Sequence, residues 1–338
     1  MVKHQAALRK PCRVAVVQPT EKYPGPEQST GLSRAFDSME YSGAALTGAR
    51  PMAITITPLA THHACTLGAQ IEGVMLQQLN AADWAAIEAA FHAHAVLIFP
   101  AQHLDADDQL AFARRFGELE ILVEGKQSIA ISNRGERGQR LREDSVYAQL
   151  LRGNEEWHTD SSYMPLAAKA SILSALVLPP TDGDTEWADM RAAYEALPAQ
   201  RRTEIEPLSA YHSLFYSQAR IGAQAKAGDY YGFNEGQAPL RPLVKTHPVT
   251  GRKALFIGRH ACNIPGMDAL ASERLLDELL AFACSPPRIY RHSWQPGDVA
   301  VWDNRCVLHR ARPYDHAYPR VMVHTRVRGN PATESALG

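Results

Sequence analysis

The second half of the chain is divided into short apolar runs, and this pattern limits the possible folds more than any other feature of the sequence. Pro/Gly turns such as Gln295–Asp298 (QPGD) and His247–Gly251 (HPVTG) join several of these runs. The runs are Ser171–Leu178, Thr185–Ala188, Leu255–Ile257, Ile289–Trp294, Val299–Trp302 and Arg320–Val327. Two helical stretches, 189–197 and 271–282, interrupt them. The sequence therefore predicts a mainly β (α+β) fold, an antiparallel sandwich or barrel with helices packed outside.

The region before these runs adds helices that begin at capping residues. Asn80 and Asp105 are suited to this position, because short polar side chains accept hydrogen bonds from the free N–H groups at a helix start. Between them, Ala95–Phe99 is a short apolar run that Pro100 ends, which predicts a buried strand. A doubly wound nucleotide-binding fold is disfavoured, since neither GxGxxG nor GxxxxGKS/T occurs.

The charge balance excludes several classes of protein. The 338 residues carry 35 Lys+Arg against 36 Asp+Glu, and 45% of them are hydrophobic. Such a chain has neither the composition of a disordered protein nor the basic surface of a nucleic-acid binder. No apolar stretch approaches the ~20 residues that cross a bilayer, and the five cysteines form no CxxC pair. We therefore expect a cytoplasmic protein with buried thiols and with no nucleic-acid or membrane partner.

Composition also divides the chain into two parts. Residues 1–51 contain the Pro-, Gly- and Ser-rich stretch 19–33, and Met52 stands directly before the first strand-like run. We expect an N-terminal appendage over 1–51 that is linker-like and weakly ordered. Residues 52–338 are expected to form one domain. Periodicity fails over roughly 121–156, which predicts an irregular lid insertion.

The segment Trp157–Tyr163 (WHTDSSY) contains the first candidate for a metal site. If the segment is extended, side chains two apart share a face, so His158 and Asp160 can aim at one point. One imidazole and one carboxylate make up two thirds of a divalent-metal site. A surface hydrogen bond between the two side chains is the alternative interpretation.

Motifs further along the chain make this site recognisable. WDN at Trp302–Asn304 is followed by His309, and Arg320 stands eleven positions after that histidine. Together with HTD at 158–160, these residues resemble the iron(II)/2-oxoglutarate oxygenases of the taurine dioxygenase and aryloxyalkanoate dioxygenase superfamily. Matching blocks in the same order are Leu97–Glu120, Asp182–Met190 and His247–Phe256. The resemblance implies a double-stranded β-helix (jelly-roll, cupin-like) core.

The resemblance also implies the roles of individual residues. His158, Asp160 and His309 would bind Fe(II) as a facial triad, which leaves three positions for a bidentate 2-oxo acid and O2. Arg320 would bind the C5 carboxylate of 2-oxoglutarate, because guanidinium forms two parallel hydrogen bonds with a carboxylate. Thr185 would donate its hydroxyl to the same cosubstrate. The implied reaction hydroxylates a small organic molecule and releases succinate and CO2.

Departures from the taurine enzyme make taurine itself an unlikely substrate. That enzyme has a second arginine four positions after the cosubstrate arginine, where this chain has His324. Leu122 and Gly125 stand where the taurine enzyme has a histidine and a tyrosine that contact taurine. Asn154, four residues before His158, does match a substrate-facing asparagine.

Two more residues are candidates for the substrate pocket. Arg326 can replace the missing cation, since strand alternation places it on the side of His324 and Arg320 if no bulge intervenes. A solvated charge is the alternative interpretation. Tyr163 follows the metal segment directly and is the second candidate. For Trp302, and for histidines such as His92 that lack a carboxylate partner at metal spacing, we expect structural roles, whereas His212 and His260 are further candidates for the border of the pocket.

Three alternatives stay open on the sequence alone. Hydroxylation next to a heteroatom would cleave a C–O or C–S bond, as in catabolism, whereas other hydroxylations would serve biosynthesis. A non-catalytic metal-binding protein on the same scaffold is the third alternative, and the complete set of triad, arginine and threonine speaks against it. By resemblance, a homodimer or homotetramer is expected.

Overall fold

The computed structural model describes residues 53–59, 65–123, 125–135 and 137–337, so the predicted appendage over 1–51 lies outside the described residues. Two sheets form the centre of the molecule. The larger has the strand order β1 (Thr55–Pro58), β2 (Ala69–Glu72), β3 (Val96–Phe99), β13 (Val299–Asp303), β5 (Ala168–Val177), β15 (Val321–Arg328) and β4 (Ser128–Ser132). The smaller has the order β12 (Ile289–His292), β6 (Thr185–Asp189) and β14 (Val307–Ala311). All pairings are antiparallel except that of β2 with β3.

Alternation along β13 shows how the sheets are sandwiched. Val299 and Val301 belong to the core cluster under the helices, whereas Ala300 and Trp302 belong to the cluster that also holds Trp187 of the smaller sheet. The Trp187 and Trp302 rings meet edge-on, 5.8 Å apart. Since side chains alternate across a strand, β13 contributes apolar side chains to the core on both faces of the large sheet. The predicted sandwich with helices outside is confirmed.

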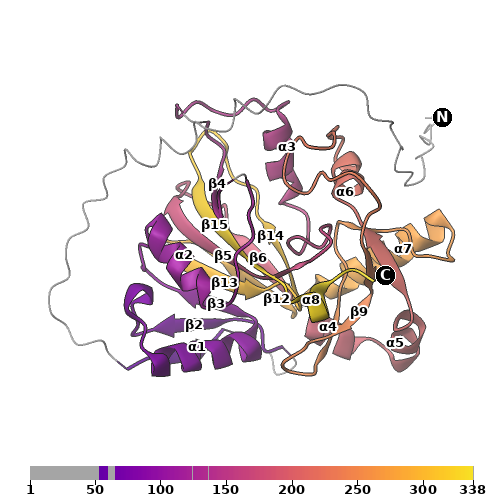
Figure 1. Cartoon of the computed structure of the whole chain (residues 1–338), viewed down its shortest axis with the longest axis horizontal. Helices are drawn as coiled ribbons and strands as arrows, with labels where there is room; N and C mark the ends of the chain where they lie inside the picture. The colour runs from indigo at the N-terminus through magenta and orange to yellow at the C-terminus, as the bar shows by residue number, and fades with distance from the viewer. Residues whose placement is uncertain (1–52, 60–64, 124, 136, 338) are drawn as a thin grey trace.

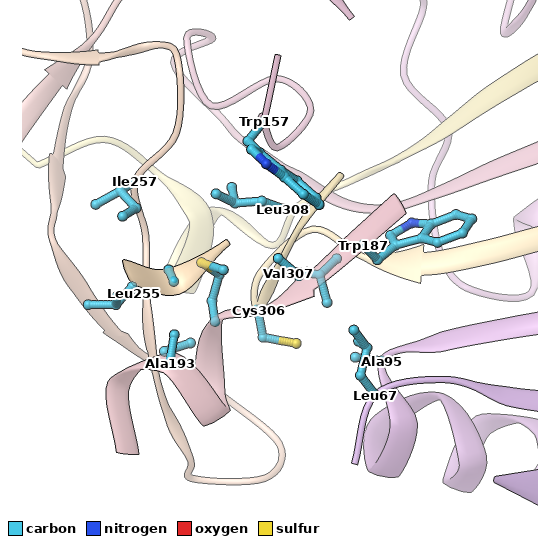
Figure 2. Close-up of a cluster of buried hydrophobic side chains, with 14 of the residues drawn as sticks. Leu67, Ala95, Trp157, Trp187, Ala193, Leu255, Ile257, Cys306, Val307 and Leu308 are labelled. Atoms are coloured by element: carbon cyan, nitrogen blue, oxygen red, sulfur yellow. The ribbon is translucent and has the colours of Figure 1, made fainter. Parts of the chain in front are cut away.

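The core under the smaller sheet lies directly behind the site described below. Trp157, Trp187 and Leu308 are 7%, 0% and 1% exposed and pack in one cluster with Val307 and Cys306 (Figure 2). Burying a large apolar side chain contributes about 1.5–3 kcal/mol to stability. Trp157 and Leu308 adjoin His158 and His309 in sequence, and Trp187 lies opposite His309 in the strand register, so the core fixes the backbone from which the candidate ligands project.

Two helices cover the outer face of the large sheet (Figure 1). They are α1 (Ala81–His94) and α2 (Ala106–Arg114), and as predicted Asn80 and Asp105 cap them by accepting from the backbone N–H groups of Asp83 and Asp108. Phe91, Phe112 and other apolar residues of the helices pack onto β3 and β13. The face turned away from the helices is thereby left for the site.

The remaining elements lie at one end of the sandwich (Figure 1). They are α3 (Val146–Gly153), α4 (Met190–Ala196), α5 (Ala199–Ile205), β7 (Ser209–His212), α6 (Leu214–Arg220), β8 (Leu240–Pro242), β9 (Val244–Thr246), β10 (Lys253–Leu255), β11 (Ala261–Cys262), α7 (Ala269–Ala283) and α8 (Pro331–Glu334). The short helix η1 (Leu76–Gln78) instead contacts α2. No helix among the described residues has the length and apolar character needed to cross a membrane.

The expectation of an irregular segment over 121–156 is wrong in two places. Strand β4 pairs along five residues with β15 of the large sheet, and helix α3 begins at Ser145, whose side chain accepts from Ala148 N. The alternation Ser128-Ile129-Ala130-Ile131-Ser132 is a strand signal that the surrounding Gly and Arg residues obscured. The segment thus contributes a strand to the sandwich itself.

Candidate metal and cosubstrate site

Three side chains converge where the two sheets face each other. One ligand atom each from His158, Asp160 and His309 lies within 4.8 Å of the others, and all three residues are buried. His309 projects from β14, and His158 pairs with it in an isolated bridge, with N–H to carbonyl distances of 3.0 and 2.8 Å. Backbone hydrogen bonding therefore brings the HTD segment beside the histidine that follows it by about half the chain's length.

The two imidazoles are in the state that a metal requires. His158 Nδ1 lies 2.7 Å from the carbonyl of Glu156, which can only accept, so Nδ1 carries the proton and Nε2 keeps its lone pair. Burial lowers the pKa of His158 to about 4, and burial holds the pKa of His309 well below its ordinary value. Both rings are neutral at pH 7 and can ligate a cation.

Asp160 is held as a carboxylate. Burial alone would raise the pKa of Asp160, but the Arg326 guanidinium and the neighbouring His309 and His324 side chains hold it well below the usual range. Arg326 Nη2 lies 2.9 Å from Oδ1, and Ser171 Oγ donates to Oδ2 at 2.7 Å. Two neutral imidazoles and one carboxylate fit a divalent transition metal with open positions.

Arg320 is a buried cation that meets no carboxylate among the described residues. Its Nε and Nη2 donate to the carbonyl of Gly183 at 3.2 and 3.0 Å, and its side chain lines a small cavity with Tyr314. The nearby Asp184 carboxylate accepts from Arg291 and Ser293 instead. A guanidinium left without a counter-ion, 5% exposed, is suited to an external carboxylate.

Thr185 stands close to the same region at the start of β6. In the strand register it lies opposite Ala311, two residues beyond His309 on β14. Its Oγ1 accepts from Trp294 Nε1 at 2.9 Å, so the hydroxyl proton remains free to be donated to another group. This geometry is compatible with the role that the resemblance implies for Thr185.

The substrate-side candidates separate into two groups. Strand β15 keeps its register against β5 from Met322 to Val327, so His324 and Arg326 share a face. A register shift between Val321 and Met322 separates both residues from Arg320, so the condition that no bulge intervenes is not met there. Both approach Asp160, His324 Nε2 to 3.5 Å from Oδ2. Leu122 is buried with its N–H on the carbonyl of Lys126. The backbone N–H of Leu122 is thus satisfied within its own loop and not by the triad.

Asn154 lies with Arg320 rather than with Arg326. It lines the small cavity of Arg320, and its carbonyl accepts from Ala311 N at 2.8 Å. Tyr163 lies on the other side, packed edge-on against His260 with ring centroids 4.8 Å apart. Beyond Tyr163 a cavity of about 340 Å³ opens, lined also by Leu214, Phe215 and the loop 232–240.

Sequence reasoning missed a cluster of hydrogen-bonding residues behind Arg326. Glu120 Oε2 accepts from Ser161 Oγ at 2.8 Å and from Tyr231 Oη at 2.7 Å, and Arg326 Nη1 donates to Ser161 Oγ at 3.3 Å. Burial raises the pKa of Glu120. Glu120 and Tyr231 are 111 positions apart, and no local pattern signals their contact.

The family model of the taurine catabolism dioxygenase TauD, TfdA family, matches residues 55–326. The chain belongs to the TauD/TfdA family. It is 51% identical over 278 residues to the (S)-phenoxypropionate/alpha-ketoglutarate-dioxygenase of Sphingobium herbicidovorans, covering 80% of this chain and 95% of the relative. The relative of the same name from Delftia acidovorans is 48% identical over 290 residues, covering 84% and 98%.

Solved structures agree with this family assignment. The crystal structure of AAD-2 in complex with Mn(II) and N-oxalylglycine superposes with a TM-score of 0.76 at 38% identity, covering 85% of this chain and all of that chain. The predicted fold class and the predicted recognition of the family are thereby confirmed. The protein is an Fe(II)- and 2-oxoglutarate-dependent dioxygenase that acts on a small organic substrate, and the relatives do not indicate taurine.

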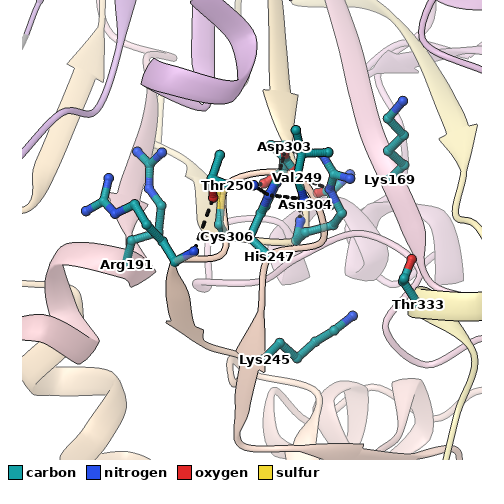
Figure 3. A network of polar contacts seen from close by, with 12 residues as sticks. Lys169, Arg191, Lys245, His247, Val249, Thr250, Asp303, Asn304, Cys306 and Thr333 are labelled. Carbon is teal, nitrogen blue, oxygen red and sulfur yellow. Dashed lines mark hydrogen bonds and ion pairs between the residues drawn. The ribbon is translucent and has the colours of Figure 1, made fainter. Parts of the chain in front are cut away.

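A second cluster of the same composition occurs in this TauD/TfdA-family chain, and it contradicts the expectation that His92 lacks a carboxylate at metal spacing. His92, His247 and Asp303 place ligand atoms within 4.8 Å of one another. Both nitrogens of His247 are occupied, however: Nδ1 accepts from Val249 N and Thr250 N at 3.2 and 3.1 Å, and Nε2 lies 3.0 Å from Asp303 Oδ2 (Figure 3). The expected structural role of His92 stays a prediction.

Proposed function

We propose that the substrate is a 2-aryloxyalkanoate and that Arg326 binds its carboxylate. One observation carries the proposal: a guanidinium that is only 13% exposed lies beside the candidate metal-ligand carboxylate, 2.9 Å from Asp160 Oδ1. The names of the relatives at 51%, 48% and 42% identity, two phenoxypropionate dioxygenases and a 2,4-dichlorophenoxyacetate dioxygenase from a Burkholderia strain, support this substrate class.

The charge of Arg326 explains why an anion would be attracted there. Burial opposes its charge, but Asp160, Tyr163 and Glu120 raise the pKa of the guanidinium. Once a divalent cation shares the negative charge of Asp160, Arg326 loses part of its compensation. A substrate carboxylate restores it. Arg326 Nε has no hydrogen-bond partner among the described residues and remains available for a second hydrogen bond.

The proposed mechanism assigns one task to each part of the site. His158, Asp160 and His309 would hold Fe(II), which supplies the activation of O2. Arg320 and Thr185 would bind 2-oxoglutarate through its distal carboxylate. Arg326 would fix the substrate so that the C–H bond beside the ether oxygen faces the metal, which converts binding energy into orientation.

The chemistry of the product follows from the position hydroxylated. Hydroxylation of the carbon that bears the aryl ether oxygen gives a hemiketal, which collapses by breaking the C–O bond. For 2-phenoxypropionate the balanced outcome is phenol and pyruvate, with succinate and CO2 from 2-oxoglutarate and O2. The cavity of about 340 Å³ beyond Tyr163 offers space for an aryl group. The proposal therefore favours catabolic ether cleavage over a biosynthetic role.

The test measures phenol and succinate with both enantiomers of 2-phenoxypropionate. We expect one phenol per succinate, and Arg326→Gln should raise KM for phenoxypropionate about 10- to 100-fold, because a charged hydrogen bond is lost. Arg328→Gln is the matched control, since Arg328 lies two residues further along β15 and half exposed, on Glu118. Absence of phenol with every aryloxyalkanoate tried, or an unchanged KM in Arg326→Gln, would overturn the proposal.

The proposal also covers the extent of the catalytic domain and the assembly state. We infer that residues 52–338 act as one catalytic domain and that 121–156 serves as its lid. Asn154 of this segment lines the cavity of Arg320, which supports that role. A homodimer or homotetramer and a cytoplasmic location stay predictions.

A further inference from the structure

Asp160 is oriented by a buried hydrogen-bond chain that begins in the WDN segment. Ser171 on β5 and Asn304 after β13 are 0% and 1% exposed. Asn304 Nδ2 donates to Ser171 Oγ at 2.8 Å, and Ser171 Oγ lies 2.7 Å from Asp160 Oδ2. Because the amide donates to the serine oxygen, the serine proton is directed at the carboxylate.

The amide of Asn304 is itself fixed. Its Oδ1 accepts from Trp302 Nε1 at 3.0 Å and from Asp160 N at 3.3 Å. Thr159 Oγ1 donates to the Asn304 carbonyl at 2.8 Å. With donors at Oδ1, the amide cannot turn around without leaving them unpaired, so Nδ2 must face Ser171. The chain is therefore directional from Trp302 to Asp160.

Two donors then define how the carboxylate stands. Ser171 holds Oδ2, and Arg326 Nη2 holds Oδ1 from the other side. Oδ2 is the oxygen nearer the imidazoles, 3.7 Å from His309 Nε2. Rotation of the carboxylate would break both hydrogen bonds. It would also allow both oxygens to approach a metal, which would occupy a position that the 2-oxo acid or O2 requires.

We propose that Ser171 and Asn304 are positioning residues that hold Asp160 with Oδ2 toward the metal and thereby keep three coordination positions open. This inference rests on the proposed metal-ligand role of Asp160. It assigns a function to the WDN segment in addition to the packing of Trp302.

The test compares Ser171→Ala and the isosteric Asn304→Asp with Ser174→Ala. Ser174 lies on the same strand, is 2% exposed, and donates to Gln109 Oε1 instead of Asp160. The readouts are the dissociation constant of Mn(II), the wavelength of the visible band of the anaerobic Fe(II)·2-oxoglutarate complex, and the KM for 2-oxoglutarate. We expect Ser171→Ala and Asn304→Asp to weaken Mn(II) binding about 10- to 100-fold and to shift the band. Ser174→Ala should change neither.

The variant His158→Ala distinguishes a wrong ligand assignment from a wrong positioning role. If His158→Ala still binds Mn(II) like the wild type, the ligand assignment itself is wrong. If His158→Ala loses Mn(II) while Ser171→Ala and Asn304→Asp keep wild-type affinity and an unshifted band, the positioning role alone is overturned. Asn304→Asp preserves size, so a packing defect in Ser171→Ala does not decide the outcome.

Discussion

The described part of the chain contains two clusters of two histidines and one aspartate that have the same composition and opposite availability. In the first, His158, Asp160 and His309 meet between the sheets. In the second, His92 of α1 meets His247, which follows β9, and Asp303 at the end of β13. Distance does not distinguish the clusters, since the ligand atoms of each lie within 4.8 Å of one another. Hydrogen bonding does.

The difference lies in how the lone pairs are used. Asp303 accepts from Arg305 Nε and Nη2 on both oxygens, at 2.7 and 2.6 Å, and His247 uses both ring nitrogens (Figure 3). Among the described residues Asp160 accepts from one guanidinium nitrogen and from Ser171 Oγ, and His158 keeps Nε2 free. A metal could bind the second cluster only by displacing the hydrogen bonds of a buried ion pair. Whether the ligand atoms have free lone pairs, and not which residue types are present, therefore defines a metal site.

The largest expected effect comes from a substitution that removes a ligand from the first cluster and leaves the second intact. His309→Ala should lower succinate formation at least about 1000-fold, because even the loss of a residue behind a ligand costs 10- to 100-fold. His92→Phe should stay within about twofold of the wild type, since His92 Nδ1 has no partner among the described residues and binds nothing that the reaction needs. Equal losses in both variants, measured with enzyme saturated in Fe(II), would remove the distinction between the clusters.

The second prediction breaks the ion pair that keeps the second cluster closed. Arg305→Met leaves the carboxylate of Asp303, 0% exposed, without its fork and should lower the free energy of unfolding by about 3–5 kcal/mol. Urea denaturation at pH 7 measures it. Arg142→Met removes an exposed pair with Asp144 and should leave the transition midpoint where it was. A stable Arg305→Met variant would contradict the structural role given to Asp303.

The third prediction extends the comparison to the arginines. Arg305 binds the carboxylate of Asp303, whereas the guanidinium of Arg320 donates to the carbonyl of Gly183. In the proposal, Arg320 binds the carboxylate of 2-oxoglutarate. Arg320→Gln should raise KM for 2-oxoglutarate about 10- to 100-fold, with a smaller change in kcat at saturation. Arg312→Gln, on the same small cavity but partly exposed, is the control. An unchanged KM in Arg320→Gln would reassign the cosubstrate cation.

The smallest effect at pH 7 concerns a buried histidine that belongs to neither cluster. His212 stacks on Phe256, neither ring nitrogen has a partner among the described residues, and burial lowers its pKa to about 3 from 6.5. A lowered folded-state pKa means that the stabilisation is complete above pH 6.5 and is lost as pH falls from 6.5 toward 3. His212 should thus cost about 1.4 kcal/mol per pH unit in that window.

The measurement is urea unfolding between pH 7 and pH 4. His212→Phe should show a shallower loss of stability with acid than the wild type. His94→Phe, at a half-buried position in the last turn of α1, is the control. Parallel slopes for wild type and His212→Phe would show that His212 is not buried as a neutral ring.

The sequence predicted the parts of the site that lie close together along the chain. His158 and Asp160 are two residues apart, so alternation along an extended segment was sufficient to place them on one face. His309 and Arg320 were assigned from the resemblance to a known family and not from periodicity. The condition on Arg326, that no bulge separates it from His324 and Arg320, could be stated from alternation. It is met toward His324 but not toward Arg320, because the register shifts between Val321 and Met322.

What the sequence did not predict depends on contacts between distant segments. Ser171 meets Asn304 across 133 positions, and Glu120 meets Tyr231 across 111, so no window of sequence contains both partners. Strand β4 was missed because flanking Gly and Arg residues masked a five-residue alternation. The second cluster lacks free ligand atoms because Arg305 donates two hydrogen bonds to Asp303, and this geometry forms only in the folded backbone.

Anaerobic titration with Fe(II) and 2-oxoglutarate tests the central claim most directly, because it reports whether the first cluster and not the second holds the metal. The wild type and His247→Ala, the latter studied below its unfolding temperature, should each develop the weak visible charge-transfer band at one Fe(II) per chain, and His158→Ala should develop none. A band that persists in His158→Ala, or one that disappears only in His247→Ala, would contradict the account.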